Sequence, residues 1–330
     1  MEKEKLLTWL LEEENPSVRY FTLRDIVGLV EGDAQLSEAR SRIMKHGAVP
    51  QILTLQSAEG WWGNAESMIM PMYTSTAWQV MLLAELGATV QDKRIAKAVD
   101  LVFSNTQAEN GSFPRLEGRF VKHQPMDLFC NDALISFGLA GVEVSPQDER
   151  MRRTLEFLAN TLMSGEYGCR FNEDGGPCAW GVIKGLRVLS VIKEADRTEI
   201  MQKAIQTSAE YLFEQVLVKM DFSLKEGNPF SEHWFRFGFP RSYQADVLQM
   251  AFVLTKLGYG KDGCLQPVVD FIANKQLPVG GWALDETWNQ LIVPFTKPSK
   301  VKPNKWITWQ AYFVLVKNGR IQQKENLSIY

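Results

Sequence analysis

The chain alternates between two kinds of helical segment. Six segments have apolar residues at helical spacing with charges between them, as in "DKRIAKAVDLVFSN". They cover residues 4–13, 36–55, 91–106, 147–163, 197–217 and 261–275. The segments that follow them are apolar on nearly all sides, which is typical of buried helices. We find no clear strand pattern, so the sequence predicts an all-α protein.

A proline opens each of the apolar segments. These prolines are Pro16, Pro71, Pro125, Pro177, Pro240 and Pro303, at spacings of 55, 54, 52, 63 and 63 residues. Proline is favoured at the first helical position because its missing N–H has no intrahelical partner there. Several of the segments end near glycine, a favoured helix stop. We therefore expect six inner helices that start near these prolines, each paired with an amphipathic outer helix.

Six helix pairs can form an open solenoid or a closed ring. The apolar inner helices favour a ring, an (α/α)6 toroid, because a ring buries them against one another and against the outer layer. We predict one such toroid domain over residues 1–330. The long connections run from outer to inner helices and would gather over the N-termini of the inner helices, where functional residues usually lie.

Composition and charge narrow the class of protein. Of the 330 residues, 45% are hydrophobic and 23% are charged, which is ordinary for a globular protein. The net charge of −3 favours neither a nucleic acid nor an anionic membrane as partner. No apolar run approaches the roughly 18–20 residues of a transmembrane segment, and the start lacks a signal-peptide pattern. With four irregularly spaced cysteines, the expectation is a cytoplasmic protein with reduced thiols.

A short motif, Gln-x-x-x-Gly-x-aromatic, occurs three times. Its copies are Gln56–Gly60–Trp62, Gln107–Gly111–Phe113 and Gln276–Gly280–Trp282. The first gap is 51 residues and the second is 169, about three repeat units. We interpret these residues as structural: the glutamine would bond backbone groups at helix ends, and the ring would pack on the neighbouring helix pair.

This motif resembles the QW repeat of squalene–hopene and oxidosqualene cyclases. Helix pairs of this length also resemble the β subunits of protein prenyltransferases. Both groups contain α/α toroids, and the likeness of repeat and fold covers essentially the whole chain. The resemblance implies an enzyme that acts on an apolar, isoprenoid small molecule in a central cavity, by carbocation or proton-transfer chemistry.

The chain departs from the cyclases at their acid motif. Protonating cyclases carry Asp-x-Asp-Asp-Thr-Ala at the start of an inner helix. Here only Thr76 and Ala77 match, because Met72, Thr74 and Ser75 stand at the acid positions. A squalene-type protonating mechanism is therefore not expected.

The chain also departs from the prenyltransferase zinc motif, Asp-x-Cys, because Gly176 stands where the aspartate should be. We predict no metal cofactor. A zinc ion would need ligands whose spacing matches no compact zinc motif: Cys130, Cys169, Cys178 and His233. Basic residues in 115–122 and 297–305 could meet a magnesium diphosphate, but no aspartate-rich magnesium cluster accompanies them.

Polar residues on the inner helices are the candidate catalytic groups, because burying them is costly. Asp127 and Asp246 are the predicted catalytic residues, since a carboxylate near a helix N-terminus suits a general base or a cation stabiliser. The predicted substrate-binding residues are Tyr73, Cys130, Asn131, Cys178, Trp180, His233, Tyr243 and Trp306. The connections 217–240 and 282–303 are longer than the others and rich in aromatic and charged residues, and we predict that they form a lid over this pocket.

Two other functions stay open. A glycan-active (α/α)6 enzyme would need two cavity carboxylates about 5–9.5 Å apart beside stacking aromatics. A non-catalytic binding toroid would keep the scaffold without the acids. A closed apolar cavity favours the isoprenoid enzyme, an open acidic groove favours the glycan enzyme, and a filled lumen favours the binding module.

Overall fold

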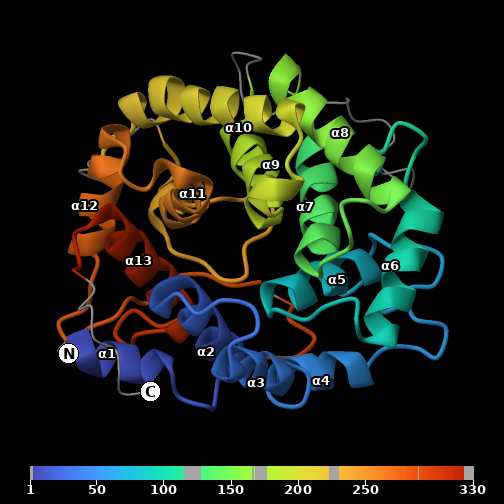
Figure 1. Cartoon of the computed structure of the whole chain (residues 1–330), viewed down its shortest axis with the longest axis horizontal. Coiled ribbons are helices and arrows are strands. Elements are labelled where there is room, and N and C mark those ends of the chain that lie inside the picture. Colours follow the sequence, from blue (N-terminus) through green and yellow to red (C-terminus); the bar gives the residue numbers. More distant parts are fainter. Residues whose placement is uncertain are drawn as a thin grey trace. The chain divides into compact units, whose positions relative to one another are not determined.

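The structure is a computed structural model that describes residues 3–114, 128–165, 167, 177–222, 230–288 and 290–322 (Figure 1). Over these residues it consists of helices, turns and isolated β-bridges, with no β-strand. The all-α prediction is confirmed for this part of the chain. Tertiary contacts group the chain into two compact units. Unit 1 is Met1–Pro50, Lys219–Thr287 and Pro294–Tyr330, and unit 2 is Gln51–Val218 and Trp288–Val293.

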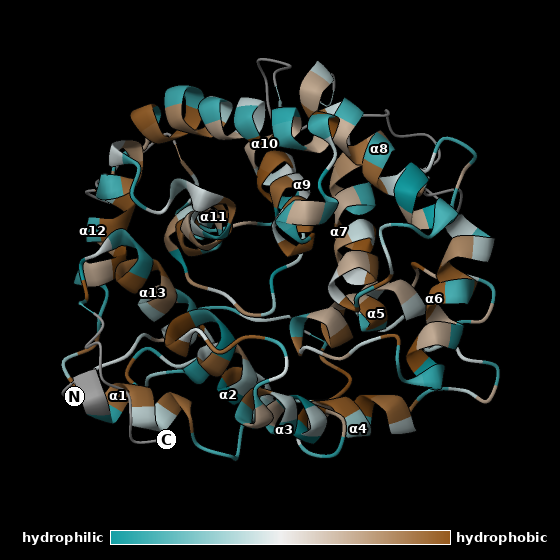
Figure 2. Cartoon of the chain, in the orientation of Figure 1, coloured by the Kyte–Doolittle hydropathy of each residue, from teal (hydrophilic) through white to brown (hydrophobic). Residues whose placement is uncertain are grey.

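Unit 2 contains three apolar helices that pack side by side in chain order, each followed by an amphipathic helix. The apolar helices are α5 (Thr76–Glu85), α7 (Leu128–Gly141) and α9 (Ala179–Val191). The amphipathic helices are α6 (Lys93–Thr106), α8 (Glu149–Ser164) and α10 (Glu199–Tyr211), the last continued by η5 (Leu212–Val216) and η6 (Leu217–Lys219). Figure 2 shows α6 and α8 alternating between hydrophobic and hydrophilic residues, whereas every residue of α5 is buried.

The three apolar helices of unit 2 run parallel, because equivalent ends meet. At their N-terminal ends, Ala77 of α5 and Asn131 of α7 line one pocket. At their C-terminal ends, Arg187 of α9 pairs with Glu85 of α5, and its guanidinium carbon lies 3.7 Å from the ring centroid of Phe137 of α7. The predicted parallel arrangement of inner helices is confirmed within this unit.

Unit 1 is built from both ends of the chain. Its inner helices are α2 (Pro16–Thr22) with η1 (Leu23–Val27), α11 (Val247–Leu254) with η8 (Thr255–Tyr259), and α13 (Lys305–Asn318). Around them the chain forms α1 (Lys3–Leu10), α3 (Ala34–Ile43), η7 (Glu232–Phe235), η9 (Gly263–Leu265) and α12 (Gln266–Asn274). α4 (Ala48–Thr54) contains residues of both units, and η4 (Glu194–Asp196) lies in unit 2.

The inner helices of unit 1 are joined by aromatic stacking and also run parallel. Phe21 of α2 stacks on Trp309 of α13 with ring centroids 4.8 Å apart, and Phe252 of α11 meets the same tryptophan at 5.0 Å. Further along all three, Lys256 of η8 pairs with Asp25 of η1, and Phe252 contacts Phe313 of α13. The six inner helices are thus present, while their closure into one toroid stays a prediction.

Helix starts follow the prolines only in part. α2 begins at Pro16, capped by Asn15, and α9 and α13 begin two residues after Pro177 and Pro303. The predicted starts near Pro71 and Pro240 are wrong, because α5 begins at Thr76 and α11 at Val247. Both prolines follow a cis peptide bond. In α11 the start is set by Asp246, whose carboxylate accepts the Gln249 N–H at 2.7 Å. Pro125 lies outside the described residues.

The predicted outer helix 36–55 is also wrong in one respect. The structure forms two helices there, α3 and α4, with a break that contains Gly47. Gly47 has φ = +80°, a left-handed conformation that ends a helix and that glycine adopts without steric cost. The other outer helices lie within a few residues of their predicted ranges.

Candidate functional site

The first two repeat glutamines bridge successive helices, which confirms the structural interpretation for these two copies. Gln56 donates from Nε2 to the carbonyl oxygens of Gly60 (2.8 Å) and of Arg94, in the first turn of α6 (2.9 Å). Gln107 donates to the carbonyl oxygen of Arg150, in the first turn of α8, at 2.7 Å, and to the hydroxyl of Thr154 at 2.8 Å. The side chain thus satisfies carbonyl groups at equivalent places in two repeats.

The repeat aromatics are buried and tied to the inner helices. Trp62 and Trp282 donate their indole N–H to the carbonyls of Ile52 and Ile272, at 2.9 and 2.6 Å. The backbone N–H of each tryptophan also donates to a threonine hydroxyl near the start of an inner helix. These threonines are Thr76 in α5 (3.1 Å) and Thr308 in α13 (3.0 Å).

In the second repeat a carboxyl group takes the place of that threonine hydroxyl. The N–H of Phe113 donates to Asp132 Oδ1 at 2.5 Å, and the Phe113 carbonyl accepts from Asn131 Nδ2 at 3.2 Å. Asp132 is 3% exposed. Burial raises the pKa of Asp132 to about 7, against the opposing effect of the Phe113 N–H. The carboxyl group is therefore poised to gain or lose a proton near neutral pH.

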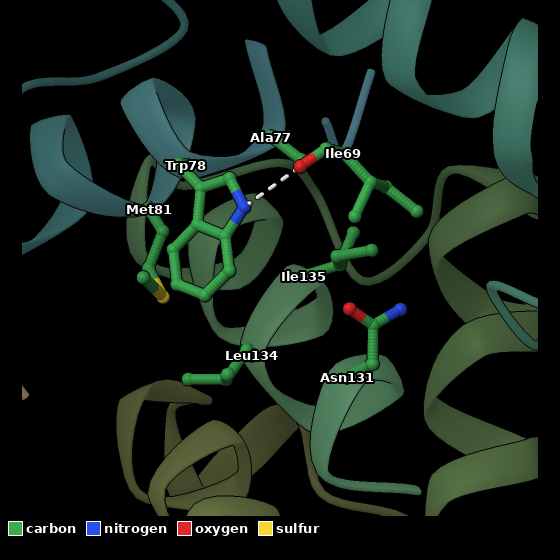
Figure 3. Close-up of a pocket in the computed structure, with 7 residues that line it drawn as sticks. All are labelled: Ile69, Ala77, Trp78, Met81, Asn131, Leu134 and Ile135. Atoms are coloured by element: carbon green, nitrogen blue, oxygen red, sulfur yellow. Dashed lines mark hydrogen bonds between the residues drawn. The ribbon is translucent and has the colours of Figure 1, made fainter. Parts of the chain in front are cut away.

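A pocket lies between the N-terminal ends of α5 and α7 (Figure 3). Asn131, the neighbour of Asp132 in the sequence, lines it, whereas Asp132 is not among the lining residues. The lining of the pocket is apolar except for the amide of Asn131: Ile69, Ala77, Trp78, Met81, Asn131, Leu134 and Ile135. The space inside it is small, about 10 Å³, which is barely enough for one water molecule. Pockets that hold drug-sized ligands enclose roughly 300–1,000 Å³, so this pocket must widen before a ligand enters.

Trp78 is the aromatic wall of the pocket, and two further rings pack against it outside the lining. Tyr73 lies 4.9 Å from Trp78 and 5.2 Å from Trp288, and the two indoles meet edge to face at 5.6 Å. Tyr73 has φ = +66°, rare for a residue with a side chain, and its carbonyl accepts from Gln79 Nε2 at 2.7 Å. The indole N–H of Trp288 is buried and makes no hydrogen bond within the described residues.

The two predicted catalytic carboxylates have different outcomes. Asp127 lies outside the described residues. Asp246 is buried and paired with Arg241, whose Nε donates at 2.7 Å, and it also accepts the N–H groups of Gly238 and Gln249. A carboxylate with these partners anchors a loop to a helix start. Asp132, which the sequence shows only as one of several polar residues on the inner helices, has the environment of an acid–base group.

The predicted substrate-binding residues divide between the two units. Unit 2 holds Tyr73, Cys130, Asn131, Cys178 and Trp180. Of these, Asn131 lines the pocket and Tyr73 contacts its wall. Cys130 and Cys178 lie together beside Gly181, where an added Cβ would be 3.5 Å from Cys130 Sγ and 3.6 Å from Cys178 Cβ. Trp180 is half-buried in the first turn of α9.

The other three predicted residues, His233, Tyr243 and Trp306, belong to unit 1. His233 Nδ1 lies 3.1 Å from Glu286 Oε1, and Arg236 and Arg241 bond the same glutamate at 3.2 and 3.1 Å. Trp306 is 3% exposed and stacks on Phe239 with ring centroids 4.2 Å apart. Tyr243 is half-buried in the connection before α11.

The two long connections that we predict to be a lid do pair with each other within unit 1. Phe237 and Asp285 exchange two hydrogen bonds, at 2.7 and 2.8 Å, and Phe239 donates to the Glu286 carbonyl at 3.2 Å. The second connection also supplies Trp288, which packs against Trp78 of the unit 2 pocket. Its action as a lid over a ligand stays a prediction.

Within the residues that the structure describes, no group of three or more His, Cys, Asp or Glu side chains could hold a metal ion. Cys169 lies outside the described residues, so the four-ligand set cannot be placed. Over the same residues, no helix combines the length and apolar character that a membrane span requires.

Comparison with known proteins adds no family. Neither the protein-family models nor the curated proteins contain a match to this chain. The function must therefore be argued from the site itself.

Proposed function

We propose that this protein is an enzyme that binds an apolar small molecule, isoprenoid in kind, and acts on it by proton transfer. The observations that carry the proposal are the apolar pocket of unit 2, which has one amide and one indole in its lining, and the buried carboxyl group of Asp132, which directly follows Asn131 of that lining. An isoprenoid chain ends in small branched apolar groups, whose apolar character matches the lining of this pocket once the pocket widens. The face of the Trp78 indole would also stabilise a developing positive charge.

Asp132 is the proposed proton-holding group. It is buried, its pKa of about 7 is near that of an efficient acid–base catalyst, and it lies next to Asn131 of the pocket wall. Asp132 accepts the backbone N–H of Phe113, and Asn131 donates to the carbonyl of the same residue. These two hydrogen bonds hold both side chains in place. We assign the acid role to Asp132 and not to Asp246, because the carboxylate of Asp246 is paired with Arg241.

Filling the pocket tests where the ligand binds. Ala77→Val adds two methyl groups to the pocket wall, which should weaken binding of geraniol or farnesol by about tenfold or more, in line with an over-packing cost of about 1–3 kcal/mol. The measurement is quenching of tryptophan fluorescence during titration with each alcohol. Ala140→Val is the matched control, because Ala140 is buried on α7 but does not line the pocket.

Two results would refute the pocket assignment. One is that Ala77→Val and Ala140→Val bind the alcohols equally well, and the other is that the parent protein binds neither alcohol. Turnover is tested separately by incubating the protein with the same alcohols and with an isoprenoid olefin, and analysing the products by gas chromatography. Product formation that is lost in Asp132→Asn would support proton transfer.

A non-catalytic binding protein is the second candidate, and one observation favours it. Two inner-helix carboxylates, unlike Asp132, are paired with an arginine: Glu85 with Arg187, and Asp246 with Arg241. A carboxylate held by an arginine stays ionised, which makes it a poor proton donor to a ligand. If the protein binds an isoprenoid in the pocket and returns it unchanged, this second function holds and the enzymatic one fails.

A further inference from the structure

Unit 1 contains a lysine in an unusual electrostatic setting. Lys256 lies in η8, and its Nζ is 3.2 Å from both carboxylate oxygens of Asp25 in η1. Arg24 binds the same carboxylate in a bidentate manner, at 2.7 and 3.0 Å. Two cations therefore share one anion, and each carboxylate oxygen accepts one bond from each of them.

Aromatic rings and a third cation surround this group. Lys256 Nζ lies 5.2 Å from the ring centroid of Phe252 and 5.7 Å from that of Phe313. Lys317 Nζ lies 5.9 Å from the centroid of the Phe313 ring. Two ammonium groups, one from η8 and one from α13, therefore lie near this ring. We name Lys256, Arg24, Asp25, Lys317, Phe252 and Phe313 the Lys256 cluster. Its charged groups carry three positive charges against one negative charge.

The cluster is partly accessible. The side chain of Lys256 is 17% exposed, that of Arg24 is 36% exposed, and Phe252 is half-buried. Asp25 is 8% exposed, so its charge is largely removed from water. A small molecule could therefore reach the lysine amine from solvent and lie against the Phe252 ring.

The environment favours loss of the lysine proton. Burial, together with the charges of Arg24 and Lys317, lowers the pKa of Lys256 to about 8, against the attraction of Asp25. At pH 8 about half of these amines are uncharged, whereas an ordinary lysine with a pKa of about 10.4 has less than about 1% in that form. The charges of Lys256 and Arg24 keep the pKa of Asp25 below its ordinary value despite its burial, so the carboxylate stays ionised beside the amine.

Both charged residues lie where an inner helix ends. Asp25 is in the last turn before Gly28, which has φ = +86°, and Lys256 lies two residues before Gly258, which has φ = +100°. Left-handed glycines are common helix ends, and they place the two side chains at the C-terminal ends of α2 and α11.

We propose that Lys256 is a nucleophilic amine that forms an imine with the carbonyl group of a small apolar or aromatic aldehyde or ketone. The lone pair of Nζ attacks the carbonyl carbon, the carbonyl π electrons move to oxygen, and the nitrogen proton is transferred to that oxygen. The resulting carbinolamine loses its hydroxyl as water and leaves a C=N bond to Nζ. Asp25 can accept and return the proton, and Phe252 and Phe313 contact the apolar part of the molecule.

The test is trapping of the imine on the whole protein. Benzaldehyde with sodium cyanoborohydride at pH 7.5 converts an imine into a stable benzylamine, and peptide mass spectrometry identifies the lysine that carries it. Lys256 should be labelled at least about tenfold faster than Lys275, because nucleophilic attack requires an uncharged amine.

Lys275 is the matched control within the chain. Its Nζ is 2.8 Å from Asp285 and lies over the rings of Phe237 and Phe271, but no arginine bonds Asp285 in the structure described. It is also more exposed, at 29%, so access alone would favour labelling of Lys275. Faster labelling of Lys256 therefore cannot result from accessibility.

A variant separates reactivity from structure. Arg24→Gln removes one of the two cations on Asp25, so that Lys256 is the one that remains. The pKa of Lys256 should then rise by about one unit, which should slow its labelling at pH 7.5 by about tenfold. Lys256→Arg should abolish the label and keep the ion pair, with helix content checked by circular dichroism. Equal labelling of Lys256 and Lys275, or unchanged labelling of Lys256 in Arg24→Gln, would overturn the proposal.

Discussion

At the scale of single residues, the decisive feature is Asp132, a carboxyl group at a position where the other two repeats have a threonine hydroxyl. Thr76, Asp132 and Thr308 all accept the N–H of a repeat aromatic. A hydroxyl at this place is neutral, whereas a buried carboxyl group must either keep its proton or carry an uncompensated charge. The second repeat thus contains an ionisable group where the other two contain none.

This replacement predicts a dependence of stability on pH. The pKa of Asp132 is about 7 when folded, above its ordinary value of 3.8. Below pH 3.8 Asp132 is protonated in both the folded and the unfolded protein, so it does not affect stability. Between pH 3.8 and pH 7 it ionises in the unfolded protein only, so the folded protein becomes less stable as the pH rises. Between pH 5 and pH 8 the parent protein should lose about 2–3 kcal/mol more unfolding free energy than Asp132→Asn, measured by urea unfolding.

Asp132→Thr is the matched control for this measurement, since it restores the residue type of the other two repeats. It should show the same weak pH dependence as Asp132→Asn. A parent protein whose stability changes with pH no more than that of the two variants would mean that Asp132 is ionised or exchanges with solvent in the folded state.

At the scale of elements, the repeat works as a connector between helix pairs. The glutamine bonds the first turn of the next outer helix, and the aromatic residue bonds the preceding outer helix and the adjoining inner helix. Gly111 has φ = +89°, and a side chain there would collide with the Arg153 carbonyl. The motif therefore has its spacing because one tight turn must present two side chains to two different helices.

Removing the glutamine should cost stability. Gln56→Ala deletes an amide that donates two hydrogen bonds and Gln107→Ala one that takes part in three, and each should lower the unfolding free energy by about 1–3 kcal/mol because hydrogen bonds between successive helices are lost. Thermal or urea unfolding measures the change. Gln206→Ala is the control, because Gln206 is exposed on α10, and it should change stability by no more than about 0.5 kcal/mol. Equal losses in all three variants would disprove the connector role.

At the scale of the whole molecule, sequence order and spatial grouping differ. Unit 1 combines Met1–Pro50 with Lys219–Thr287 and Pro294–Tyr330, so its inner helices α2, α11 and α13 come from opposite ends of the chain. Phe21 and Asp25 from the first segment contact Trp309 and Lys256 from the others. This grouping makes the first segment necessary for the packing of the last.

Deleting residues 1–50 tests this dependence. Without Phe21 and Asp25, the helices α11 and α13 lose apolar contacts and leave Lys256 without its anion, so their amides should exchange with deuterium much faster. Hydrogen exchange read by mass spectrometry should show a smaller effect in α5 and α7, which belong to unit 2. Equal loss of protection in α5 and α13 would contradict the grouping.

The helical class, the alternation of outer and inner helices, and the structural role of the repeat could all be predicted from the sequence. These features depend on local periodicity, on helix propensity and on a short motif, all of which are legible along a single chain. Helix starts at Pro16, Pro177 and Pro303 followed from the same local rules to within two residues. At Pro71 and Pro240 those rules failed, because the helices begin later, at Thr76 and Val247.

Which polar groups have partners depends on the folded structure and could not be predicted from the sequence. Asp246 and Asp132 look alike in the sequence, since each is a carboxylate near the start of an apolar helix. In space, Asp246 meets Arg241 and two backbone N–H groups, whereas Asp132 receives one backbone N–H and no cation among the described residues. The fate of a buried charge depends on groups within a few ångströms of it, and those groups come from distant parts of the chain. The pairing of Lys256 with Asp25, 231 residues apart, has the same physical origin.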